Sequence, residues 1–172
     1  MEKPALYILC GIPFSGKTTL ARELVKRLGF VRVDLDEVKF SLLGRDIKDE
    51  QIDQVQWDKV YQEMYKRIES HLKKGKIVVN DTGNFTRHER NLVRKTADRF
   101  GLKSIVIYVD TPKSVAQKRL LENRKTGGRF DVSDEDFENT VKEMEFPMED
   151  EDFIVFDGSF LIEDWLDRCF AS

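Results

Sequence analysis

The feature that most constrains this chain is an eight-residue segment, Gly11-Ile12-Pro13-Phe14-Ser15-Gly16-Lys17-Thr18. Its glycines, lysine and threonine have the spacing of a phosphate-binding loop, or P-loop. Residues 5–10, before it, are all apolar, as expected of a strand buried on both faces. Residues 17–28, after it, are predicted to form a helix that Gly29 closes. Because the motif stands between a strand and a helix, the sequence favours a phosphate-binding loop over a chance glycine turn.

The rest of the chain also alternates strands and helices. Further strands are predicted at 30–33, 77–79, 103–109 and 153–156, and helices at 34–44, 49–74, 86–101, 111–123, 133–146 and 159–170. This alternation predicts an α/β fold with a parallel sheet, helices on both of its faces, and ligands at the carboxyl ends of the strands. We expect the 172 residues to form one domain.

The P-loop assigns definite roles to its residues. Glycines let backbone N–H groups surround phosphates, and the start of the next helix adds positive charge. Lys17 is expected to reach the β- and γ-phosphates, and the Thr18 hydroxyl to bind Mg²⁺. The predicted cofactors are therefore ATP and Mg²⁺, held by residues 11–18 together with Thr19.

Three acids follow the second predicted strand. Asp34 and Glu37 have the spacing of a helix cap, which leaves Asp36 in the first helical turn. A carboxylate at this edge of the sheet could accept a proton from a hydroxyl that attacks ATP. It could equally complement the helix dipole, and the spacing alone does not decide between the two.

Asp81 follows the third predicted strand, the position of an acid that holds Mg²⁺ through water or orients Thr18. The alternative is a residue that forms a turn at the end of a strand. The P-loop in the same sheet favours the metal role.

A basic segment follows the fourth predicted strand. Between Lys113 and Arg129 six basic residues stand against one acid, Glu122. We expect a lid at about 122–132, in which Arg124 and Arg129 bind the transferring phosphate. The alternative is an ordinary solvated face.

Several motifs together resemble the AAA-type P-loop kinases related to polynucleotide 5′-kinase, chloramphenicol phosphotransferase and the zeta toxins. Besides the P-loop they are Val33-Asp34-Leu35-Asp36-Glu37-Val38-Lys39, Asn80-Asp81-Thr82-Gly83-Asn84-Phe85-Thr86-Arg87, Arg90, Lys118-Arg119 and Arg124-Lys125. The resemblance implies a P-loop NTPase fold with strand order 2-3-1-4-5. It also implies ATP-dependent transfer of the γ-phosphate to a hydroxyl group.

The same resemblance implies roles for individual residues. Asp36 would be the base, and Lys39 would steady the acceptor or its phosphate. Asn84, Arg87 and Arg90 could also contact the acceptor, although surface arginines are more often simply solvated. The turn at residues 157–159 would lie near the adenine.

The acceptor is expected beneath the segment between the second and third strands. There Trp57, Tyr61 and Tyr65 recur every fourth residue, a pattern more typical of a core stripe than of a rim that stacks on a ring. Residues 130–153 carry one basic residue, Lys142, among many acids, so a long polynucleotide is not favoured as acceptor. A small molecule or a nucleotide end remains open.

Composition narrows the alternatives. Two cysteines and two histidines without ligand spacing predict neither a disulfide framework nor a zinc site. No apolar run approaches the roughly 20 residues of a membrane span, and residues 1–4 lead directly into a strand, so we expect a cytoplasmic protein.

Two rival functions are a partner-coupled ATPase and a nucleotide sensor without turnover. The Asp36 and Lys39 pair and the basic segment favour a kinase over both.

Overall fold

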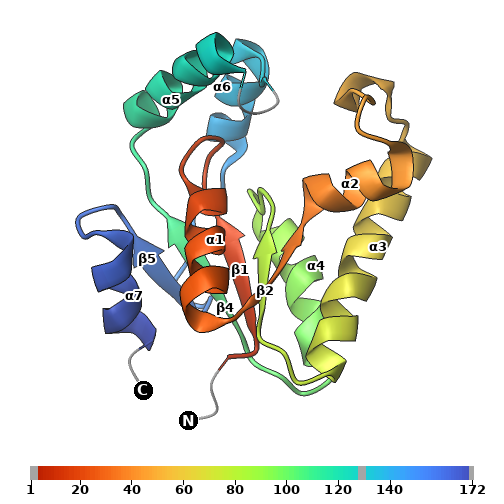
Figure 1. The fold of residues 1–172 in the computed structure, drawn as a ribbon, viewed down its shortest axis with the longest axis vertical. Helices are drawn as coiled ribbons and strands as arrows, with labels where there is room; N and C mark the ends of the chain where they lie inside the picture. The colour runs from red at the N-terminus through yellow and green to blue at the C-terminus, as the bar shows by residue number, and fades with distance from the viewer. Residues whose placement is uncertain (1–3, 128–130, 171–172) are drawn as a thin grey trace.

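The computed structural model describes residues 4–127 and 131–170. Within them five strands form one parallel sheet in the order β2-β3-β1-β4-β5 (Figure 1). The strands are β1 Leu6–Cys10, β2 Val31–Asp34, β3 Val78–Asp81, β4 Ser104–Val109 and β5 Phe153–Phe156. The predicted fold class and strand order are confirmed.

Helices cover both faces of the sheet and extend beyond its carboxyl edge. They are α1 Lys17–Leu28, α2 Leu35–Leu43, the short 3₁₀ helix η1 Asp49–Gln51, α3 Gln54–Lys73, α4 Arg87–Asp98, α5 Lys113–Thr126, α6 Asp134–Glu143 and α7 Ile162–Phe170. Figure 1 shows α5 and α6 beyond the carboxyl ends of the strands, at the top of the view. In the part of the chain described here, no helix combines the length and the apolar character needed to cross a membrane.

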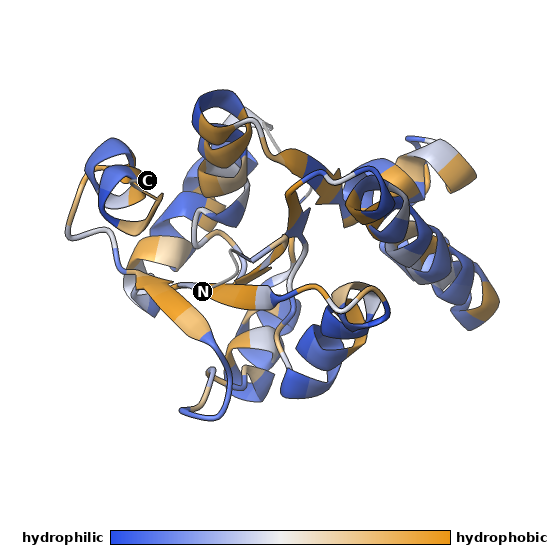
Figure 2. Ribbon diagram, turned by 90° about the horizontal axis from the view of Figure 1, so that it is seen from below, coloured by the Kyte–Doolittle hydropathy of each residue, from blue (hydrophilic) through white to orange (hydrophobic). Residues whose placement is uncertain are grey.

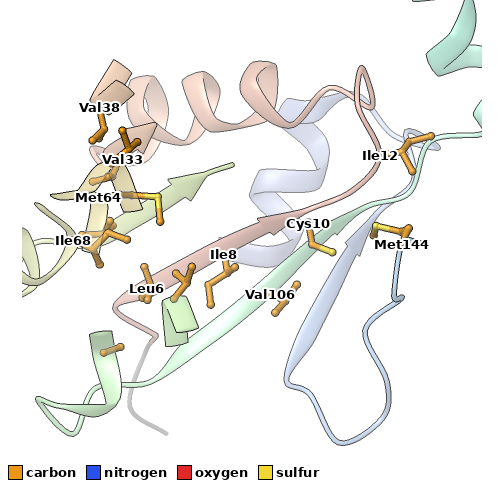
Figure 3. Close-up of a cluster of buried hydrophobic side chains, with 14 of the residues drawn as sticks. Leu6, Ile8, Cys10, Ile12, Val33, Val38, Met64, Ile68, Val106 and Met144 are labelled. Carbon is orange, nitrogen blue, oxygen red and sulfur yellow. The ribbon is translucent and has the colours of Figure 1, made fainter. Parts of the chain in front are cut away.

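The alternation of side chains along β1 divides the core into two clusters. Leu6, Ile8 and Cys10 pack on one face with residues of α3 and α4, as Figure 3 shows for Met64 and Ile68. Tyr7 and Leu9 pack on the other face with residues of α1 and α7. Successive residues of a strand point to opposite faces, so an unbroken apolar strand supplies both clusters. Figure 2 accordingly shows the strands mostly in the hydrophobic colour and the helices striped with both colours.

Several predicted helices begin later than expected; α7, for example, begins at Ile162 and not at residue 159. The helix predicted at 49–74 is divided into η1, which ends at Gln51, and α3, whose start Asp53 caps reciprocally with Gln56. The helix predicted at 111–123 is α5, which begins at Lys113 after its N-cap Pro112, because the Thr111 hydroxyl donates to the Ser15 carbonyl of the P-loop at 2.8 Å and caps no helix.

A buried ion pair joins α4 to the segment before β5. The Arg90 side chain has no exposed surface, and its guanidinium bonds both carboxylate oxygens of Glu151, at 3.0 and 2.7 Å. It also donates to the Glu145 carbonyl at 2.8 Å. The prediction that Arg90 contacts an acceptor is therefore wrong, because this side chain is fully engaged inside the protein.

We expect Glu151→Gln to lower the free energy of unfolding by about 3 kcal/mol, because the mutation leaves the Arg90 charge buried without its counterion. Urea denaturation measures this. Asp150→Asn is the matched control, since Asp150 pairs with Arg87 at the surface and should leave the unfolding midpoint unchanged. Equal losses in the two variants would contradict a special role for the buried pair.

Candidate active site

The P-loop connects β1 to α1 and has a backbone that only glycine permits at two points. At Gly11, with φ of +153°, a Cβ would lie 2.7 Å from the Val109 carbonyl oxygen. Gly16, with φ of +106°, is the N-cap of α1 and offers no side chain to the first N–H groups of that helix. These donors therefore stay available to a ligand at the positive end of the helix dipole.

Side chains of the loop leave a place for an anion. Lys17 Nζ donates to the carbonyls of Gly11, at 2.6 Å, and Ile12, at 2.8 Å, so the ammonium group lies against the loop. The Ser15 hydroxyl is buried and has no hydrogen-bond partner among the described residues. A buried hydroxyl without a partner is costly. A phosphate oxygen bound in the loop would satisfy it, so the loop fits the phosphates of a nucleotide.

A cleft of about 300 Å³ lies between the P-loop, the start of α2 and the loop after β3. Its walls include predicted site residues from three separate segments: Lys17, Thr18, Asp36, Lys39 and Asp81. The fold thus brings the predicted base and the predicted metal-binding acid to the phosphate loop.

Thr18 and Asp81 approach each other as the metal prediction requires. The Thr18 hydroxyl donates to Asp81 Oδ1 at 3.4 Å. The described residues contain no cluster of three or more side chains that could cage a metal ion. Mg²⁺ is commonly held by one or two protein oxygens together with substrate phosphates and water, and Thr18 and Asp81 fit that arrangement.

Arg32 is a site residue that the sequence reasoning missed. Its guanidinium donates to Asp81 Oδ2 at 2.7 Å and to Glu37 at 2.9 Å, and it also pairs with Asp34. Asp34 and Asp81 are neighbours in the β2–β3 register. A signal was present, because Arg32 and Asp34 are two apart in a strand and must share a face.

Asp36 and Lys39 lie together, in opposite environments. The Asp36 side chain is 57% exposed in the cleft, whereas that of Lys39 is 3% exposed. Lys39 Nζ is 3.1 Å from Asp36 and 2.7 Å from Asp49. Burial disfavours the charged ammonium, but the bonds to Asp49 and Asp36 outweigh it and raise the pKa of Lys39. Two carboxylates therefore already balance this cation.

A second hollow, which we call the apolar pocket, adjoins the cleft between α3 and α4. It measures about 370 Å³ and shares Thr82, Gly83 and Phe85 with the cleft. Tyr61 and Tyr65 line it, while Val60, Met64, Ile68 and Leu72 of the same helix are buried. The aromatic stripe is thus partly core, as the pattern favoured, and partly the wall of a pocket.

A third hollow, of about 580 Å³, lies on the opposite side of the P-loop. Thr19, Asp157 and Gly158 line it. The turn at residues 157–159, which the resemblance would place near the adenine, therefore lies beside the P-loop. Arg119 also lines it and donates to the carbonyls of Phe14, at 3.2 Å, and Ser15, at 3.0 Å.

The arginines predicted to bind the transferring phosphate are not found at the cleft in the described residues. Arg124 is held by Asp131, at 2.8 Å, and Asp134, at 2.9 Å, and does not line the cleft. Arg119 is instead the arginine at the P-loop. Arg129 lies outside the described residues.

Two further predicted acceptor contacts have partners elsewhere. Arg87 pairs with Asp150 at 2.6 Å, away from the cleft. Asn84 borders the apolar pocket, but its amide donates to the Leu9 carbonyl at 2.8 Å and to Asn80 at 2.9 Å. The Asn84 side chain therefore fixes the loop after β3.

Comparison with known proteins places this arrangement in a family. Residues 6–147 match the family described as an AAA domain. No curated protein sequence matches the chain.

Solved structures share the fold at low sequence identity. Chaetomium thermophilum Kti12 in complex with ADP-AlF3 has a TM-score of 0.73 and 19% identity, covering 96% of this chain and 97% of that one. A putative kinase from Chloroflexus aurantiacus J-10-fl has a TM-score of 0.72 and 20% identity, covering 98% and 95%. A sugar kinase from Janibacter sp. HTCC2649 has a TM-score of 0.69 and 16% identity, covering 97% and 92%.

Proposed function

Since the chain belongs to the AAA domain family, we propose that it is a P-loop kinase that moves the γ-phosphate of ATP to a hydroxyl group. The observation that carries the proposal is the single cleft that joins a complete P-loop to Asp36 and Lys39. A hydrolase also needs the P-loop. Because its acceptor is water, however, it does not need a separate acceptor pocket with a carboxylate and a buried lysine beside it. The kinases among the structural neighbours support the same reading.

In the proposed reaction the acceptor oxygen attacks the γ-phosphorus of ATP. The bond from that phosphorus to the bridging oxygen breaks, and ADP leaves with the electron pair. The acceptor proton passes to the Asp36 carboxylate, which is exposed in the cleft and able to receive it. The N–H groups of the loop and Lys17 would stabilise the charge on the phosphoryl oxygens.

The third hollow would hold the nucleoside, since it lies across the P-loop from Asp36. Arg119 would supply positive charge from this side. Mg²⁺, when bound, neutralises charge on the β- and γ-phosphates, and Thr18 and Asp81 would hold it. Arg124 would act only if it left Asp131 and Asp134, as in closure of the lid expected at about 122–132, of which residues 128–130 lie outside the described residues.

The test is a transfer assay with ATP labelled at the γ-phosphate, with and without Mg²⁺, against small alcohols, nucleosides and oligonucleotides with a 5′-hydroxyl. We expect Mg²⁺-dependent label in one acceptor class, and ADP release that depends on the acceptor. ADP release at the same rate without any acceptor would instead indicate a hydrolase. ATP binding without turnover under every condition would indicate a nucleotide sensor.

A further inference from the structure

We infer that the acceptor is a small, ring-containing alcohol without negative charge, whose body lies in the apolar pocket between α3 and α4. This inference rests on the proposed function and names its substrate class. It excludes phosphorylated acceptors and nucleic-acid ends, which the sequence left open.

The first support is the position of the apolar pocket. Its wall residues Thr82, Gly83 and Phe85 are also walls of the cleft that holds Asp36. The Phe85 ring lies over Gly83, where even a Cβ would come within 2.2 Å of a ring carbon. The two hollows therefore adjoin at Gly83 and Phe85, and a molecule seated in the pocket would present its hydroxyl group to Asp36 across this rim.

The second support is the surface that the pocket offers. Tyr61, Tyr65 and Phe85 provide rings, and Met64, Leu92 and Val93 provide apolar side chains. The Tyr61 and Tyr65 ring centroids are 6.4 Å apart, so the two rings form one continuous aromatic wall. A volume of about 370 Å³ lies within the usual range for small-molecule sites, which are largely apolar with a few polar groups. A ring or short hydrocarbon body suits such walls better than a phosphate-rich chain.

The third support is charge. Asp58 and Glu89 are the charged residues that line the pocket, and no basic side chain lines it within the described part of the chain. Glu89 accepts hydrogen bonds from the Thr86 N–H and hydroxyl, which keeps its carboxylate at the wall. Burial, reinforced by the negative charge of Glu89, raises the pKa of the Tyr61 hydroxyl to about 12.

The buried cation of α2 beside Asp36 does not reverse this balance. Lys39 is held between Asp36 and Asp49, so two carboxylates offset its single charge. An acceptor phosphate would meet at least as much negative as positive charge on this side of the cleft. A neutral alcohol meets no such repulsion, and an ammonium group would gain from Asp58, Glu89 and the aromatic faces.

The test measures binding without ATP, so its result does not depend on phosphate transfer. Three probes share one ring and one alcohol: 4-(aminomethyl)benzyl alcohol, 4-methylbenzyl alcohol and 4-(hydroxymethyl)benzoate. Chemical-shift changes in the protein would locate and quantify the binding of each at low salt. We expect the amine and the neutral probe to shift residues of the apolar pocket, and the carboxylate to bind at least about tenfold more weakly than the amine.

Asp58→Asn should reduce the preference for the amine over the carboxylate probe, since it removes one wall charge from an exposed position. Asp150→Asn, outside both hollows, should leave the preference unchanged. Equal or tighter binding of the carboxylate probe, no binding of any probe in the pocket, or occupation of the pocket by an oligonucleotide with a 5′-hydroxyl would each overturn the inference. A protein that transfers phosphate but gives one of these results would retain the proposed function and lose this acceptor class.

Discussion

We expect Lys17→Ala to lower phosphate transfer by about 10³-fold, because it removes a positive donor from the charge that develops on the transferring phosphate. ATP affinity should also fall, by roughly 10- to 100-fold, the usual loss for a hydrogen bond to a charged group. The two carbonyls that accept from Lys17 belong to Gly11 and Ile12 of the same loop, so the core does not depend on them. Calorimetry with Mg-ATP and single-turnover transfer measure the two effects separately.

Lys26→Ala is the matched control for this experiment. Lys26 lies on the same helix, its side chain is 72% exposed, and its partner is Glu23 at 3.7 Å. The control removes the same charge from α1 without touching the loop. If Lys17→Ala and Lys26→Ala bind Mg-ATP equally well and transfer phosphate at the same rate, the nucleotide site is not where we place it.

The sheet and its order could be predicted from the sequence because the signals for them are local or come from the family. The strands are short and rich in apolar residues, and capping residues mark the start of several helices, as with Thr86 before α4 and Ser133 before α6. The resemblance of the motifs to P-loop kinases then supplied the strand order. The predicted bounds of a helix were wrong where two local signals competed. At Asp53, for example, a helix cap interrupts an otherwise helical pattern.

The site residues that could be predicted are likewise those whose positions follow from local signals in the sequence. The P-loop, Asp36 and Asp81 could be placed because each lies at or just beyond the carboxyl end of a strand, and parallel strands end at one edge. Arg90 could not be interpreted correctly, because its partner Glu151 is 61 residues away and contributes a buried carboxylate that no helical spacing reveals. Arg124 pairs in the structure with Asp131 and Asp134, which are close to it in the sequence, and its contact with the transferring phosphate stays a prediction.

Asp36→Asn should reduce transfer by roughly 10²- to 10⁴-fold, the range for loss of a positioned general base. The substitution keeps the size of the side chain and removes its charge and most of its basicity. ATP should bind as before, because the loop, Lys17 and Thr18 are unchanged. Lys39 keeps its bond to Asp49, so the buried ammonium retains a counterion and the start of α2 stays folded.

The choice of control for Asp36 follows from the structure. Asp34 is unsuitable, because it caps α2 by accepting from the Glu37 N–H and also pairs with Arg32 near Asp81. Glu37 is the better neighbour, since its side chain is 65% exposed, it meets Arg32 only at the surface, and it does not line the cleft. Glu37→Gln therefore removes one carboxylate charge from the same helical turn and should leave single-turnover transfer nearly unchanged. If Glu37→Gln slows transfer as much as Asp36→Asn does, the effect comes from the field of the helix terminus, and Asp36 is not the base.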